Sequence, residues 1–223
     1  MNKYTIQALL ITGLLALSGA ASADFGVGFK AGTLGLGFEG RWSPIPWLDV
    51  RAGANQYDYD TSGSQAGINY DATLALDNYY LTGNFRFPLS PFRITAGAFA
   101  NANEVQMASF DTGGADITIG NDTFSAADVG TLQSVTSFDD TSPYLGVGYD
   151  FEIFGKVGLN LDFGLLWQGE PSVTLVATGF DNAPPSVQAQ LGPALEAERL
   201  EIENEVSDYK AWPVVSLGFV YNF

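Results

Sequence analysis

The chain of 223 residues contains no cysteine and no histidine. The missing cysteine excludes disulfides and thiol nucleophiles, and the missing histidine removes the usual general base at neutral pH. Together the two absences also exclude the common zinc sites. A hydrolase built on Asp and Glu alone stays open, but no carboxylate pair is singled out by its spacing. We therefore expect a protein that is not an enzyme and that holds no metal or other cofactor.

Basic residues are scarce as well. Nine Lys and Arg stand against 25 Asp and Glu, so the formal net charge is −16. This charge repels phosphate groups, which argues against nucleic acid as a partner and against direct contact with anionic surfaces.

Long apolar runs are confined to the first residues. Lys3 precedes an apolar stretch over 8–17 and a small-residue cleavage site, Ala21-Ser22-Ala23, so residues 1–23 are predicted to be a cleaved signal peptide. The alternative, a membrane anchor, is disfavoured because the stretch is too short to span a bilayer. Residues 24–223 then form one domain.

What the chain does contain is alternation with a period of two. In the last segment Val215, Leu217, Phe219, Tyr221 and Phe223 alternate with mostly small or polar residues. One face of such a strand meets an apolar medium and the other does not. Further segments with this pattern are 25–31, 34–42, 48–55, 81–87, 92–98, 145–153 and 159–167.

The number of strands depends on the region around Gly32. The phase of the alternation changes at Gly32-Thr33, so Leu34 begins a new face with Leu36 and Phe38. A tight hairpin there gives eight strands, whereas a bulge gives one long strand and an odd total. We favour eight: if the strands close into a transmembrane β-barrel, their number should be even, as it is in single-chain bacterial barrels.

Short and long connections alternate along the chain. Turns near 43–46, 88–91 and 154–156 are short, whereas 60–69, 109–137 and 179–208 are predicted to be long loops. This asymmetry is typical of an antiparallel transmembrane β-barrel, and a soluble β-sandwich is the alternative. Aromatic residues at the strand ends favour the membrane, because they suit its two interfaces. They are Trp42, Trp47, Phe87, Phe92, Phe151 and Phe154 at one end, and Trp167, Tyr209 and Trp212 at the other.

Charged residues occupy the faces that would point inward. Ions in a narrow lumen must be paired or hydrated, so we expect a structural network of ion pairs, with a gated ion-conducting lumen as the alternative. Tyr57, Tyr59 and Tyr80 belong to the same interior or to the rim. The predicted network consists of Glu39, Arg41, Asp49, Arg51, Arg86, Arg93, Asp150, Glu152 and Asp162.

Residues 186–209 break the strand pattern. Leu191, Leu195, Ile202, Val206 and Tyr209 recur at helical spacing among glutamates, which predicts an amphipathic helix in the last long loop. We expect it to pack on the barrel rim as a cap; a plug in the lumen and a partner-binding helix are the alternatives.

The long loops are acidic, with local pairs at Asp58 and Asp60 and at Asp139-Asp140. A solvated acidic surface is the simplest interpretation. The sharper hypothesis is that Ca²⁺ or Mg²⁺ bridges these carboxylates to lipopolysaccharide phosphates, since direct contact would be repulsive.

The whole mature chain resembles the small bacterial outer-membrane β-barrels, the group that contains the OmpA membrane domain, OmpX and OmpW. The segment 34–42, a turn, and then 47–54 are similar to their early hairpins. Segments 30–37, 92–97, 142–148, 166–173 and 194–209 more closely resemble a family of uncharacterised proteobacterial outer-membrane proteins.

The resemblance implies a location in the outer membrane of a Gram-negative cell, in contact with its lipid and lipopolysaccharide. It also implies that the barrel assembly machinery reads the terminal strand, with Phe219, Tyr221 and Phe223 as the signal. Outer-membrane enzymes of this kind use a catalytic histidine, so none of their mechanisms transfers. A structural or interaction role in the cell envelope is expected, and a narrow pore for ions or small apolar solutes is the alternative. No peptidoglycan-binding domain is expected after Phe223.

Overall fold

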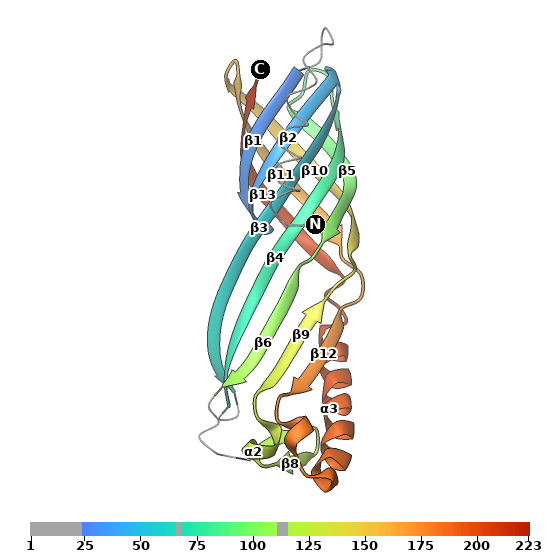
Figure 1. The fold of residues 1–223 in the computed structure, drawn as a ribbon. Helices are drawn as coiled ribbons and strands as arrows, with labels where there is room; N and C mark the ends of the chain where they lie inside the picture. The colour runs from blue at the N-terminus through green and yellow to red at the C-terminus, as the bar shows by residue number, and fades with distance from the viewer. Residues whose placement is uncertain (1–23, 66–67, 111–115) are drawn as a thin grey trace, which may run out of the picture.

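The computed structural model describes residues 24–65, 68–110 and 116–223 (Figure 1). The predicted signal peptide lies outside these residues. Among them, no helix is both long enough and apolar enough to cross a membrane.

Eight antiparallel strands form a closed ring. Each strand pairs with the next one in the ring, and the ring closes where β1 pairs with β13. β1 and β2 are separate strands joined by the tight turn at Thr33-Leu34, with Gly32 opposite Gly35. The prediction of eight strands is therefore confirmed, and the bulged strand and the β-sandwich are excluded. The strands are β1 (Asp24–Gly32), β2 (Gly35–Ile45), β3 (Leu48–Gln65), β4 (Ile68–Arg86), β5 (Phe92–Asn101), β10 (Thr141–Phe154), β11 (Val157–Trp167) and β13 (Ala211–Asn222).

The outer surface of the ring is an apolar band. Phe29 and Phe38 on paired strands are 63% and 64% exposed, with their rings 4.3 Å apart. A soluble protein would bury such side chains, whereas a lipid bilayer solvates them. Leu34 is an exception to the predicted pattern: it sits in the turn and is only 4% exposed, so it does not share the outer face of Leu36.

The terminal strand β13 closes the ring, and the backbone N–H of Phe223 donates to the carbonyl of Phe25 at 2.9 Å. Of the side chains predicted as the assembly signal, Phe219 and Tyr221 are exposed on the outer face of this strand, and Phe223 is exposed directly after its end. Val220, the one apolar residue out of phase, points into the barrel and is buried.

The two ends of the barrel differ as predicted. Connections β2–β3, β4–β5 and β10–β11 are short, and Trp42 and Trp47 lie exposed beside the first of them. At the other end Trp167 is exposed, but Trp212 is not part of an outer aromatic ring. It packs inside the barrel mouth, so its assignment to the membrane interface was wrong.

At the end away from the short connections β2–β3, β4–β5 and β10–β11, β3 and β4 continue beyond the closed ring as part of an open sheet (Figure 1). Short turns are typical of the periplasmic side of such barrels, so we call this sheet extracellular. β3 and β4 remain paired up to Gln65 and Ile68, so residues 60–65 and 68–69 are paired strands and not part of the predicted loop; residues 66–67 lie outside the described residues. The continuous ladder explains this difference, because each added residue pair extends hydrogen bonds that already exist. The sheet is completed, in the order β4-β6-β9-β12, by β6 (Glu104–Phe110), β9 (Leu132–Ser137) and β12 (Ser172–Ala177).

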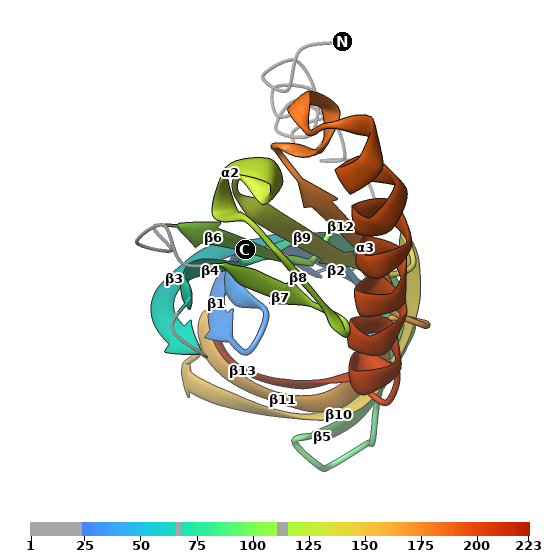
Figure 2. The ribbon, with the colours of Figure 1, turned by 90° about the horizontal axis from the view of Figure 1, so that it is seen from below.

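A separate hydrophobic core forms outside the barrel, on one side of this sheet (Figure 2). Leu191 and Ala194 of α3 (Pro185–Val206) are buried against Ile117, Ile119 and Phe124. The predicted helix is thus confirmed. It packs on β12, however, and not on the barrel rim or in the lumen, because the sheet offers apolar side chains there. The smaller elements are β7 (Ile117–Ile119), β8 (Asp122–Phe124), α2 (Ala126–Val129) and the 3₁₀ helix η1 (Phe180–Asn182).

Candidate functional site

The centre of the barrel lumen is a layer of ion pairs around Arg51. Its guanidinium contacts Asp49 at 3.0 Å, Glu39 at 3.3 Å and Asp150 at 3.3 Å. Arg51, Glu39 and Asp49 are buried. Period-two alternation on β2, β3 and β10 brings these side chains inward, where the curvature of the closed sheet makes them converge.

Asp150 is a second centre of the same layer. Besides Arg51 it contacts Arg86 at 3.1 Å and Arg93 at 3.0 Å. Arg93 also pairs with Asp162 on β11, and it donates hydrogen bonds to Asn84 and Thr95. Residues from six strands are therefore linked across the lumen.

Of the nine residues predicted for this network, eight take part. Arg41 lies at its edge, 3.8 Å from Asp49. Glu152 does not join it: the side chain is exposed at the periplasmic mouth, where no ion pair with another described residue forms. Its inward phase is right, but the strand has already left the packed interior at that height.

Sequence reasoning missed Lys30. It follows Gly26 and Gly28 on the inner face of β1, and its ammonium lies 3.8 Å from the centre of the Tyr80 ring. The alternation of Val27 and Phe29 with these residues was the signal that would have revealed it. Tyr80 belongs to the interior, whereas Tyr57 and Tyr59 are exposed beyond the barrel.

An apolar layer closes the extracellular end of the lumen, above the ion pairs. Tyr80 and Phe99 stack with ring centres 5.0 Å apart, and Tyr144 follows at 5.3 Å from Phe99. We call this layer the aromatic plug. Its members are Leu34, Tyr80, Phe99, Tyr144, Leu166 and Val214, with Trp212 packed against them.

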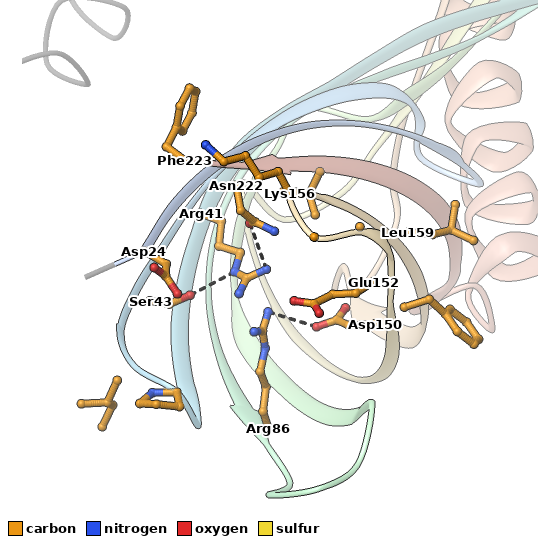
Figure 3. Close-up of a pocket in the computed structure, with 16 residues that line it drawn as sticks. Asp24, Arg41, Ser43, Arg86, Asp150, Glu152, Lys156, Leu159, Asn222 and Phe223 are labelled. Carbon is orange, nitrogen blue, oxygen red and sulfur yellow. Dashed lines mark hydrogen bonds and ion pairs between the residues drawn. The ribbon is translucent and has the colours of Figure 1, made fainter. Parts of the chain in front are cut away.

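The space left inside the barrel is unequal at the two ends. A cavity of about 340 Å³ opens at the periplasmic end, where Arg41 donates to Ser43 and Asn222 and Arg86 points to Asp150 (Figure 3). Between the ion pairs and the aromatic plug only about 20 Å³ remains. This is about the size of one water molecule. The lumen is therefore open toward the periplasm, whereas side chains fill it from the ion-pair layer to the aromatic plug near its extracellular end.

The chemistry of the lumen is that of paired charges. Its carboxylates face guanidinium groups, and the part of the chain that the structure describes holds no cluster of three or more acidic side chains arranged to bind a metal ion. Removing one partner of such a buried pair leaves the other charge without compensation, which is costly.

The closed ring, the apolar outer band and the charged interior define a small outer-membrane β-barrel. Its fold is similar to two solved structures from Acinetobacter baumannii. CarO2 is 22% identical with a TM-score of 0.59, over 90% of this chain and 98% of that one. CarO is 24% identical with a TM-score of 0.57, over 89% of this chain and 97% of that one. No protein-family model and no curated protein matches the chain.

Proposed function

We propose that this chain is a non-catalytic, non-conducting barrel that anchors an interaction module on the outside of the outer membrane. One observation carries the proposal: the aromatic plug and the ion-pair layer lie in series in the lumen, with only about 20 Å³ between them. A hydrated ion needs more room than one water molecule occupies. Passage would require both layers to move.

The energetics of the ion-pair layer support a barrier. Arg51 and Arg93 are buried and each contacts at least two carboxylates. Separating such groups leaves charges unpaired in a medium of low dielectric constant, at a cost of about 3–5 kcal/mol for each broken partner. Thermal motion therefore opens this layer rarely.

The extracellular part supports the interaction role. Its sheet and helix have a hydrophobic core of their own, distinct from the aromatic plug. A barrel that served only as a membrane filler would not require a second core. Connecting segments carried by a rigid scaffold are also where binding functions concentrate.

Planar bilayer recordings test the proposal. The purified mature protein is expected to give no reproducible current. Two controls show that the protein is inserted in the membrane. The first is a variant with Phe99→Ala and Arg93→Ala, which removes side chains from the aromatic plug and from the ion-pair layer. The second is protease protection of the wild-type protein in the same membranes. Reproducible current from the wild type would replace this proposal by the narrow pore for ions or small apolar solutes.

Contact with lipopolysaccharide through divalent cations is a further proposal, and it has its own test. The acidic extracellular side chains and the lipid phosphates would share Ca²⁺ or Mg²⁺. If a chelator leaves lipopolysaccharide binding by the folded barrel unchanged, bridging does not occur.

Recognition of Phe219, Tyr221 and Phe223 by the barrel assembly machinery is likewise proposed. Phe223→Ala should then lower the yield of folded protein in the outer membrane.

A further inference from the structure

The sidedness of β4 reverses where the strand leaves the membrane. Within the barrel its inner face carries polar Asn78, Thr82 and Asn84. Beyond the barrel the same face, followed with a period of two, carries Leu76, Leu74, Ala72 and Tyr70. The pairing of β3 with β4 shows no shift of register, so these residues continue one surface.

The neighbouring strands β3 and β6 also carry apolar residues on this face. Apolar residues lie directly opposite one another in the register. Leu74 of β4 is opposite Tyr59 of β3 on one side and opposite Val105 of β6 on the other. We call this surface the inner face of the extracellular sheet. Over β3, β4 and β6 it consists of Tyr57, Tyr59, Tyr70, Ala72, Leu74, Leu76, Val105 and Met107.

Only half of the inner face is covered. Over β9 and β12 it meets the extracellular core, where Leu132 and Ala177 pack with α3 and β7. Over β3 and β6 it is open: Tyr57 is 47%, Tyr59 56% and Met107 39% exposed. Figure 2 shows α3 and α2 near β12 and β9, away from the end of β3.

The charges around this surface are strongly one-sided. The barrel carries six acidic and six basic side chains; it is formed by residues 24–55, 78–101, 141–167 and 211–223. The other described residues carry 18 acidic side chains and only two basic ones, Arg199 and Lys210. The opposite face of the same hairpin contributes Asp58, Asp60 and Asp71. An occupant of the inner face therefore gains from positive charge.

We propose that the inner face of the extracellular sheet binds a cationic amphipathic polypeptide, with the apolar side of the peptide against Tyr59 and Met107. This proposal rests on the interaction role given above and names the chemistry of the partner. The excess of 16 acidic over basic groups disfavours a second copy of the chain. Anionic lipid is disfavoured for the same reason.

The dimensions fit a helix. Leu76 is only 4% exposed, so the accessible part of the face on β4 runs four residues from Tyr70 to Leu74, about 13 Å for an extended strand. A helix of about 9 residues spans this length, and a peptide of about 13 residues covers it with one turn to spare; it would place apolar side chains at intervals of three and four. At the β12 edge of the sheet α3 stands in the way of an added β-strand, since Glu203 accepts from the N–H of Val173 and Arg199 donates to its carbonyl. At the other edge, β3 beyond Gln56 pairs with β4 alone among the described residues, so strand addition there is the competing mode of binding.

Binding is measured with the full mature chain in nanodiscs of zwitterionic phosphatidylcholine. The probe is a labelled peptide of about 13 residues with leucines on one helical face and lysines on the other. Three controls accompany it: empty nanodiscs, a peptide of scrambled order, and a peptide with glutamate in place of lysine. We expect the amphipathic lysine peptide to bind the protein more tightly than all controls, and less tightly as salt is added.

Substitutions locate the site. Tyr59→Ser combined with Met107→Ser is expected to weaken binding about tenfold. Val176→Ser, at a comparably exposed apolar residue on the opposite face of β12, should leave it unchanged. Both variants alter exposed side chains, and heat-modifiable mobility on gels verifies that each is folded.

Three results would overturn the proposal: equal binding to empty nanodiscs, equal binding of the scrambled peptide, or equal binding by the Tyr59 and Met107 variant. Conductance recordings on the same preparations keep the two proposals separate. A silent barrel that fails to bind the peptide contradicts only the partner chemistry, whereas a conducting barrel that binds it contradicts only the closed lumen.

Discussion

The hydroxyl of Tyr80 donates a hydrogen bond to the carboxylate of Glu39 at 3.0 Å, and Glu39 in turn pairs with Arg51. This hydrogen bond joins the aromatic plug directly to the ion-pair layer. Tyr80 belongs to both layers, because its ring stacks on Phe99 while its hydroxyl reaches the charges below. The two barriers in the lumen are therefore mechanically joined.

Removal of this hydroxyl should weaken the barrel. Tyr80→Phe leaves Glu39 with one donor fewer in a buried place, so we expect a loss of about 2 kcal/mol in the free energy of unfolding. Urea unfolding in detergent micelles measures it. Tyr79→Phe is the matched control, since the neighbouring ring is exposed on the outer face of the same strand. Equal effects of the two changes would contradict the role of the hydrogen bond.

Asp150 and Glu152, two residues apart on β10, should differ sharply. Asp150→Ala removes a carboxylate shared by Arg51, Arg86 and Arg93, so the carboxylates that remain no longer balance these guanidinium groups, and we expect a loss of about 3–5 kcal/mol in the free energy of unfolding. Glu152→Ala changes an exposed side chain at the mouth and should stay within about 0.5 kcal/mol of the wild type. The same unfolding measurement decides, and similar losses for both would remove Asp150 from its central position.

A methyl group at Gly148 should displace Arg93. A Cβ there would lie 2.4 Å from the guanidinium carbon of Arg93, so the side chain must leave its place between Asp150 and Asp162. We expect Gly148→Ala to destabilise the barrel and to broaden the NMR signals of the Arg93 guanidinium. At Gly83, on the outer face, the nearest atom to such a Cβ is 3.9 Å away, and Gly83→Ala should be tolerated. An unchanged Arg93 in the first variant would refute the expectation.

The helix outside the membrane predicts a pH dependence. Arg199 donates hydrogen bonds to Glu196, which lowers the pKa of that carboxyl below its ordinary value. A lowered folded-state pKa means that the contact stabilises α3 above the ordinary pKa of glutamate, about 4.3, and is lost as the pH falls through the lowered value. NMR titration of Glu196 measures this. In Arg199→Ala its midpoint should rise toward the ordinary value; an unchanged midpoint would exclude the contact in solution.

Much of the barrel was predictable because each strand alternates between lipid and lumen. This pattern is local, so Phe219, Leu217 and Val215 reveal their outward face without knowledge of any partner strand. The inward charges were predictable for the same reason, as Arg51 and Arg93 occupy the opposite phase. A helix was predicted over 186–209 from the spacing of apolar residues, and α3 is observed over Pro185–Val206. Tyr209, the last residue of the predicted apolar stripe, lies beyond the helix and is exposed.

Other features depend on contacts between distant segments. Residues 60–69 include many polar residues and have the composition of a loop, yet the ladder between β3 and β4 continues over 60–65 and 68–69. Trp212 matched the pattern of an interface residue but turns inward, because Leu166 and Val214 offer it an apolar mouth. The docking of α3 was decided by β12, a short strand that the alternation did not reveal.

The sequence by itself determined the period and the sidedness of the strands, since these follow from the chemistry of consecutive residues against lipid and water. The number of strands was decided by the pairing of β1 with β2 and β13. Only the tertiary structure decided which charges meet, that Tyr80 ties the plug to Glu39, and that the apolar side of β3 and β4 changes faces outside the membrane. The physical reason is that closure of the ring brings together residues from strands far apart in the chain, and such distances are set by the register of the whole sheet.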